Sequence, residues 1–205
     1  MRFIGSLLLV VILVALAGAA FVMSGVYTIG ADEPHWDITA RAIDTLRDRS
    51  VAAHARGIAV PNLEDPHLLA EGAEHYAAMC TGCHLAPGTR DSQLRAGLYP
   101  QPPNLAEAGI DDPGEAFWII KHGIKLTAMP AWGRTHSDDA IWALVAFVKK
   151  LPQLTPEQYQ QMTAGGGEPA HHHHDHDDSS GEQHDHEHGG DAHDHPAPAD
   201  HGHGG

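Results

Sequence analysis

The sequence predicts an all-α domain in the middle of the chain. Helix-start signals, in which Asp or Ser precedes proline or acidic residues, stand at Asp65-Pro66, Asp112-Pro113 and Ser137. The segments behind them are rich in apolar residues, and the ends of the chain differ from this middle in composition. We therefore expect a membrane anchor or signal peptide at 1–25, a linker at 26–61, the helical domain at 62–154 and a disordered tail at 155–205.

The formal charge of −15 is unevenly distributed. All twelve Lys and Arg residues precede Leu151, whereas the ten acidic residues from Gly165 onward give the tail a charge of −10. Nucleic-acid binding requires clustered cations that neutralise phosphates. An acidic chain of this kind argues against a nucleic-acid partner.

Phe3 to Met23 contain no charged residue, and about 20 apolar residues in a helix span a bilayer. Arg2 precedes this segment and no Lys or Arg follows before Arg41, so the positive-inside rule places the rest of the chain outside the cytoplasm. A cleaved signal peptide is the alternative, because Ala15-Leu16-Ala17 and Ala17-Gly18-Ala19 offer small residues for cleavage. We favour a retained anchor in a bacterial inner membrane, with the domain and the tail on the periplasmic side.

The linker at 26–61 is predicted to hold one amphipathic helix, capped by Asp37 and ending near Ala55. Its apolar face is formed by Ile38, Ala42, Ile43 and Leu46. The other face carries four arginines, Arg41, Arg47, Arg49 and Arg56, and we expect it to be solvated rather than to bind lipid or a partner. For Trp36 two interpretations are equally open, a residue at the membrane interface and a hydrophobic staple for the helix.

The helical domain is expected to begin with Asp65 as N-cap and Pro66 as the first helical residue. Gly72 and Tyr76 share a face of this helix, so a second helix can cross it closely at the glycine. A capping box, Asp112-Pro113-Gly114-Glu115, opens a helix that stops at Gly123. The last helix is capped by Ser137 and closed by Leu151-Pro152.

The chemistry of the sequence is concentrated in Cys80-Thr81-Gly82-Cys83-His84. C-x-x-C-H is the attachment motif of a c-type haem, in which both thiols add to the vinyl groups and the histidine ligates the iron. The alternative is a redox C-x-x-C with an accidental histidine, but such motifs need a βαβ setting that this sequence lacks. A Gly- and Pro-rich loop follows as far as Leu105, and we expect one of its carbonyls to accept the Nδ1–H of His84.

With these residues placed, residues 65–152 resemble the class I monohaem cytochromes c, and most closely the short type in cytochrome subunits of respiratory oxidases. The matching features are Gly72 and Tyr76 before C-x-x-C-H, Trp118 and Ile120 before Gly123, Met129-Pro130 and Phe147-Val148. The resemblance implies a fold around one covalent haem, with Met129 as the sixth iron ligand. It also implies a crossing of the first helix with the Trp142–Val148 helix.

Residue chemistry supports Met129 as well. A thioether is a soft neutral ligand, and Met/His ligation raises the potential of a haem. The alternatives are a core methionine at this position and ligation by His122 or His136. The apolar shell that lowers the dielectric around the haem is expected to include Leu105, Trp118, Ile120 and Trp132.

The tail contains twelve of the nineteen histidines, interspersed with Asp and Glu. A short segment, Pro156–Met162, is expected to be helical, but from Gly165 onward the sequence has no large apolar residue and cannot form a core. Imidazole and carboxylate together suit divalent zinc, nickel, cobalt or copper; the candidate ligands are His171, His172, His173, His174, His176, His184, His186 and His188. The alternative is a solvating tail whose charge rises as its histidines protonate.

Our interpretation is an electron carrier rather than an enzyme: a membrane-anchored periplasmic cytochrome that transfers one electron between redox proteins or membrane oxidoreductase subunits. A second hypothesis is a metal-handling protein, in which the tail binds metal and the haem serves its reduction or sensing. A third is an enzyme or gas sensor, which requires that Met129 leave the iron open.

Overall fold

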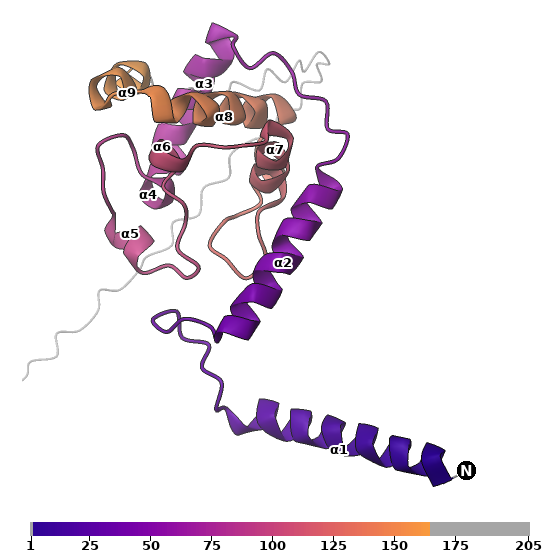
Figure 1. The fold of residues 1–205 in the computed structure, drawn as a ribbon. Helices are drawn as coiled ribbons and strands as arrows, with labels where there is room; N and C mark the ends of the chain where they lie inside the picture. Colours follow the sequence, from indigo (N-terminus) through magenta and orange to yellow (C-terminus); the bar gives the residue numbers. More distant parts are fainter. Residues whose placement is uncertain (1, 165–205) are drawn as a thin grey trace, which may run out of the picture. The chain divides into compact units, whose positions relative to one another are not determined.

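A computed structural model of the chain describes residues 2–164. Its helices in that range are α1 Arg2–Ser24, α2 Asp37–His54, α3 Pro66–Met79, α4 Thr81–His84, α5 Gln93–Ala96, α6 Leu105–Ala108, α7 Pro113–His122, α8 Asp138–Lys150 and α9 Pro156–Thr163 (Figure 1). Short 3₁₀ turns lie at Trp132–Arg134 and Leu151–Gln153. No strand occurs within residues 2–164, so the all-α prediction is confirmed for the part that the structure describes.

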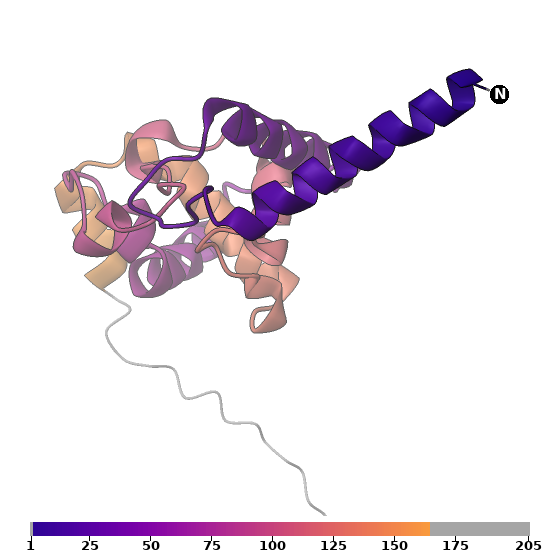
Figure 2. The same ribbon diagram turned by 90° about the horizontal axis from the view of Figure 1, so that it is seen from below.

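The apolar N-terminal segment forms one unbroken helix, α1 (Figure 2). Phe3–Ser24 is long and apolar enough to cross a membrane, and none of its most apolar window is buried. A signal sequence near an N-terminus has the same length and composition. The structure is therefore compatible with the anchor and with the signal peptide.

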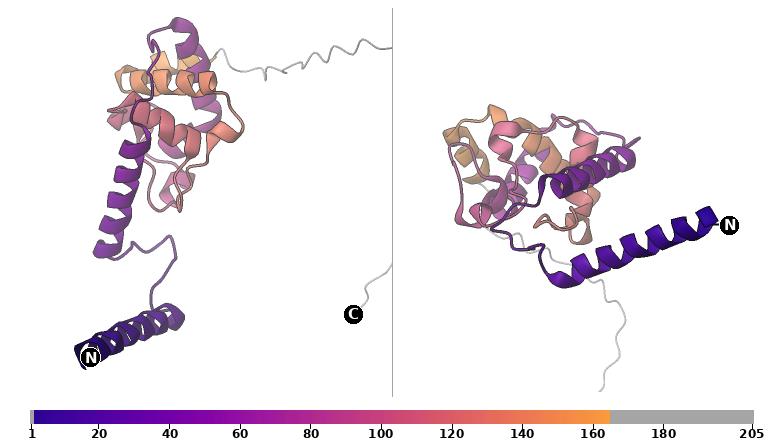
Figure 3. Two further views of the ribbon diagram at one scale, coloured as in Figure 1. Left: turned by 90° about the vertical axis from the view of Figure 1, so that its right-hand side faces the viewer. Right: turned by 60° about the horizontal axis from the view of Figure 1, so that its bottom comes forward.

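The core is organised by the crossing of α3 and α8 (Figures 1 and 3). A Cβ atom on Gly72 would overlap the carbonyl oxygen of Ala143 and would lie 2.8 Å from the Cβ atom of Phe147, so only glycine permits this approach. The Tyr76 and Phe147 rings pack with centroids 5.5 Å apart. The crossing expected from the resemblance, Gly72 and Tyr76 against the last helix, is confirmed.

The caps agree with the sequence in all but two details. Asp65 accepts from His67 N, Ser137 accepts from Ala140 N, and Asp112 accepts from the amides of Gly114 and Glu115. The Glu115 side chain does not return a bond to the Asp112 backbone, so α7 has only half of the predicted capping box. At α2 the N-cap position belongs to Trp36, and Asp37 is the first helical residue instead of the cap.

The packed region extends beyond residue 154, where the tail was expected to begin. Helix α9 follows, closed at its N-terminus by a reciprocal capping box between Thr155 and Gln158. Tyr159 is buried in the same cluster as Tyr76 and Phe147. The Tyr159 side chain therefore anchors α9 to the core, while most of the other residues of this helix are exposed.

Helix α2 packs on the domain through a face that the sequence did not favour. Val51 is buried, whereas Ile38 and Leu46 of the predicted apolar face are 77% and 72% exposed. The His54 ring stacks on the Trp118 ring of α7 with centroids 5.4 Å apart. The arginine-bearing face was expected to be solvated, but Arg47 and Arg49 line a cavity of the domain.

Candidate functional site

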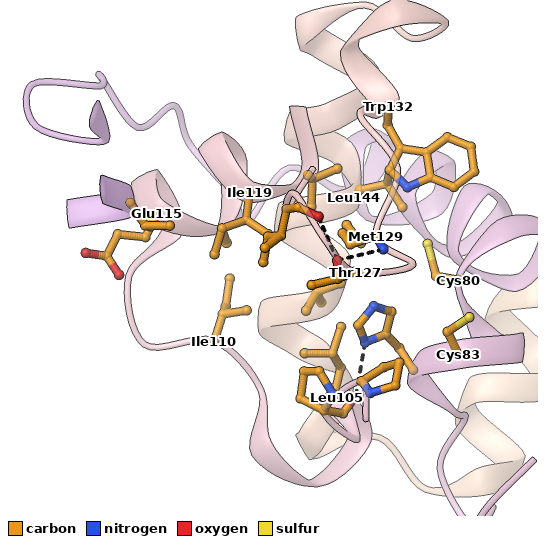
Figure 4. A pocket seen from close by; sticks show the side chains of 18 of the residues that line it. Cys80, Cys83, Leu105, Ile110, Glu115, Ile119, Thr127, Met129, Trp132 and Leu144 are labelled. Atoms are coloured by element: carbon orange, nitrogen blue, oxygen red, sulfur yellow. Dashed lines mark hydrogen bonds between the residues drawn. The ribbon is translucent and has the colours of Figure 1, made fainter. Parts of the chain in front are cut away.

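A cavity of about 920 Å³ lies between α2, α4, α7 and the loops that precede α6 and follow α7 (Figure 4). This volume is in the upper part of the range for ligand pockets, roughly 300–1,000 Å³. Cys80, Cys83, His84 and Met129 all line it, although Met129 lies 45 positions after His84 in the sequence. The fold thus brings together the residues that the sequence selected.

The two cysteines lie at one end of the cavity, where α3 passes into α4 (Figure 4). Amides of Cys83 and His84 both donate to the carbonyl of Cys80, which closes a single helical turn around the motif. The two thiols do not form a disulfide with each other. Burial, with a smaller contribution from Cys83, raises the pKa of Cys80 to about 12. A redox C-x-x-C motif needs a lowered thiol pKa, so this environment argues against the thioredoxin-like alternative.

The His84 ring is oriented by a hydrogen bond outside its own helix. Its Nδ1 lies 3.0 Å from the carbonyl oxygen of Pro103. Because a carbonyl only accepts, Nδ1 carries the proton and Nε2 keeps its lone pair for a ligand. The predicted acceptor in the loop before Leu105 is therefore confirmed as Pro103.

The charge state of His84 suits the same role. Burial lowers the pKa of His84; the bond to Pro103 partly opposes this effect, and the nearby Arg95 reinforces it. The imidazole is therefore held neutral, which is the form that coordinates a metal.

Met129 is placed by a tight turn after α7. Gly123 ends that helix at φ +65°, and a Cβ atom there would lie 2.7 Å from the Met129 carbonyl oxygen. Thr127 holds the turn, since its hydroxyl donates to Ile124 O at 2.8 Å and accepts from Met129 N at 3.1 Å. In Figure 4 the Met129 side chain lies within the cavity, between Thr127 and the end that holds the cysteines.

Three of the four predicted shell residues line the cavity, namely Leu105, Ile120 and Trp132. Trp118 does not, and its ring instead packs against the rings of His54 and His122. Lining residues that the prediction missed include Ile110, Ile119, Leu144, Val148, Arg47 and Arg49. Leu144 and Val148 are one turn apart on α8, a spacing that marks any core face and does not by itself reveal a cavity.

The rival ligands of Met129 are not brought to the cavity. His122 and His136 do not line it within the described residues, and their rings pack on Trp118 and Trp132 respectively. The candidate metal ligands of the tail, from His171 to His188, lie outside the described residues, so metal binding there stays a prediction.

The donor set fits a c-type haem. A neutral imidazole and a thioether are its usual axial ligands, and the two thiols that line the same cavity are the groups to which its vinyl groups would bond. The walls between them are largely apolar, as a site for a low-dielectric cofactor requires.

Comparisons with known proteins give the same assignment. Residues 67–148 match the family model described as cytochrome C oxidase, cbb3-type, subunit III. A segment of 92 residues is 34% identical to the cbb3-type cytochrome c oxidase subunit FixP of Rhizobium meliloti (strain 1021) and covers 42% of this chain. It covers 28% of FixP, so the chain spans less than a third of that relative in the match. The resemblance of residues 65–152 to monohaem c-type cytochromes of the oxidase-subunit type is thereby confirmed.

Proposed function

We propose that the domain carries one haem c, attached through Cys80 and Cys83 and ligated by His84 and Met129, and that it transfers single electrons. The bound haem would supply a ferric–ferrous couple with both axial positions filled. The observation that carries this proposal is the convergence of a neutral imidazole and a thioether on one largely apolar cavity beside two thiols. Met/His ligation raises the haem potential relative to nitrogen pairs.

The contacts that hold the turn at Met129 favour an electron carrier over an enzyme or a gas sensor. Gly123 and Thr127 hold the backbone of Met129 beside the cavity, which supports ligation of the sixth position by its sulfur. A filled sixth position leaves no site for a substrate or a gas. The chain would therefore act as a carrier within a larger oxidoreductase.

We further propose that α1 is a retained anchor in a bacterial inner membrane, with the domain on the periplasmic side. The absence of Lys and Arg between Arg2 and Arg41 supports this orientation. The similarity to a cbb3-type oxidase subunit supports partners among the subunits of a membrane oxidoreductase.

The test is the absorption spectrum of the purified full-length protein and of two methionine variants. Met129→Ala removes the proposed ligand, and Met79→Ala is a matched control because Met79 also lines the cavity but adjoins Cys80. We expect the wild type and Met79→Ala to show the weak long-wavelength band of ferric iron bound to a methionine sulfur. Met129→Ala should lose this band and should bind carbon monoxide after reduction.

Two results would contradict the proposal. Loss of the band in Met79→Ala, with Met129→Ala unchanged, would transfer the axial role to Met79. A high-spin wild type that binds carbon monoxide would replace the carrier with chemistry at an open iron.

A further inference from the structure

The cations that line the cavity come from one helix. Within residues 2–164, Arg47 and Arg49 are the only Lys or Arg side chains in its wall, and both belong to α2. Helix α2 lies outside the segment 67–148 that matches the cytochrome family model. The positive charge of the cavity wall therefore comes from outside the segment that matches the family model.

Helix α2 is held in place independently of these arginines. Val51 is 6% exposed, and the His54 ring stacks on Trp118 with an interplanar angle of 29°. A Cβ atom on Gly114 would lie 3.8 Å from the carbonyl oxygen of Ala55, so the backbone just after α2 approaches the first turn of α7 closely. Arg47 lies one helical turn before Val51, on the face that meets the domain.

The α2 side of the cavity lies across from the cysteines. Figure 4 shows Cys80 and Cys83 at one end and Glu115 of α7 toward the other. Helix α2 packs on α7. In a haem the two pyrroles with vinyl groups are opposite the two with propionates, so a haem attached to both cysteines would direct its propionates away from them, toward the side of α2 and α7.

We propose that Arg47, together with Arg49 of the same cavity wall, binds the haem propionates, so that α2 completes the cofactor site. The inference rests on the proposed attachment through Cys80 and Cys83. An arginine fork matches a carboxylate in two parallel hydrogen bonds, which is the geometry that a propionate presents. The side chain of Arg47 is 37% exposed, so it reaches the cavity while remaining at its edge.

The other charged residues at this end of the cavity are all acidic. The facing carboxylates are Asp48 on α2 and Asp111, Asp112 and Glu115 at the start of α7. Asp112 is already bonded to the amides of Gly114 and Glu115. Without the arginines, two propionates would face these carboxylates with no cation in the cavity wall, and like charges at short range repel.

The present partners of Arg47 leave it available. It pairs with Asp44 and Asp48, both at 2.9 Å and both on α2 itself. Ion pairs between solvent-exposed side chains stabilise a protein only weakly, so Arg47 can exchange these partners for a propionate at little cost. Arg95, which lies near His84, is bonded to Pro102 O and Asp91 and does not line the cavity.

The test compares two double variants of the full-length, haem-loaded protein in detergent. Arg47→Gln/Arg49→Gln removes the cavity pair. Arg41→Gln/Arg56→Gln removes the same charge from residues of the same segment that do not line the cavity. The readout is the midpoint potential, measured by spectroscopic redox titration between about pH 5 and pH 9.

We expect the cavity variant to have a lower midpoint potential at neutral pH than the control variant, because loss of a nearby positive charge favours ferric iron. Unpaired propionates also hold protons to higher pH. The midpoint potential falls with rising pH as the propionates lose their protons. This fall should therefore occur at higher pH in the cavity variant than in the wild type, and the control variant should show no such shift. A variant that retains both charges, Arg47→Lys/Arg49→Lys, should keep a potential close to that of the wild type.

Equal potentials and equal pH profiles in the two glutamine variants would overturn the assignment. Hydrogen exchange of the α2 amides shows whether α2 stays docked on the domain in each variant. If α2 undocks in Arg47→Gln/Arg49→Gln, the test is decided by Arg47→Lys/Arg49→Lys. A midpoint potential of the lysine variant as low as that of the glutamine variant would then overturn the assignment. Failure of the proposed function is distinguishable, because the wild type would then lack covalent haem or the methionine–iron band. If haem and band are present and the potentials are unchanged, only the propionate assignment fails.

Discussion

The Tyr76 hydroxyl donates a 2.7 Å hydrogen bond to the carbonyl oxygen of Leu85, nine residues further along the chain. It also contacts the carbonyl oxygen of His84 at 3.2 Å. Leu85 has φ +65° and ψ 170°, a conformation that glycine adopts far more readily. A buried tyrosine on α3 thus holds the backbone that turns away from the haem motif.

Removal of this hydroxyl should weaken the domain. Tyr76→Phe leaves the buried carbonyl of Leu85 without its donor, which costs about 1–3 kcal/mol of unfolding free energy. The matched control is Tyr159→Phe, because the Tyr159 hydroxyl makes no hydrogen bond within residues 2–164. Guanidinium unfolding followed by haem absorbance should separate the two variants, and equal midpoints would show that the Tyr76 bond is not stabilising.

The Gly72 crossing should not tolerate a methyl group. Gly72→Ala drives a Cβ atom into the backbone of Ala143, which cannot give way as a flexible side chain would. We expect a loss of about 1–3 kcal/mol or more, because overpacking shifts both helices. Gly97→Ala is the control, since its Cβ atom would make only ordinary contacts of 3.7 and 3.9 Å. A Gly72→Ala domain as stable as the control, by the same unfolding assay, would contradict this crossing.

The turn that places Met129 should depend on Gly123. In Gly123→Ala the alanine would have to adopt the unfavourable φ of +65°, and its Cβ atom would lie 2.7 Å from backbone atoms of Met129 and Pro130. Gly57→Ala is the control, because the alanine would have a similarly unfavourable φ of +81° but its Cβ atom would have no neighbour within 4 Å. We expect only Gly123→Ala to lose intensity in the methionine–iron band of the ferric spectrum. The same band in both variants would mean that Met129 finds its place without this turn.

A stabilising substitution is expected at Leu126. This residue has φ +62° and is 87% exposed, so it has an unfavourable backbone conformation without the benefit of burial. A left-handed leucine costs about 1–2 kcal/mol, and glycine avoids this at an entropic cost of about 0.5–1 kcal/mol. Leu126→Gly should therefore raise the unfolding free energy slightly, by about 0.5 kcal/mol. Leu94→Gly, in α5, should lower it by about 1 kcal/mol, and a loss in both would contradict the expected relief of strain.

The sequence predicted the parts of the fold that short motifs encode. The caps at Asp65, Asp112 and Ser137 form through contacts within three residues, so their signals are complete in the local sequence. The crossing at Gly72 was also predictable, because Gly72 and Tyr76 share one face of α3. The missing side chain of the glycine leaves room there for the backbone of a second helix.

The parts that were missed depend on contacts between distant segments. Residues of α9 carry little apolar content, and only the Tyr76 and Phe147 rings of the core make Tyr159 a packing residue. The docked face of α2 was misjudged for a related reason. Its most apolar stripe is exposed, and Val51 with His54 provides the contact, which depends on the position of Trp118.

The docking of α2 limits how far the domain can travel. Twelve residues separate the end of α1 at Ser24 from the start of α2 at Asp37, and an extended chain of that length reaches about 40 Å. The backbone amide of His35, near the end of this link, donates to the Tyr99 hydroxyl at 3.0 Å, which shortens the free part further. With α1 in the membrane as we propose, the haem would stay within a few tens of ångströms of the lipid surface. Its electrons would then pass between neighbours in one membrane assembly rather than across the width of the periplasm.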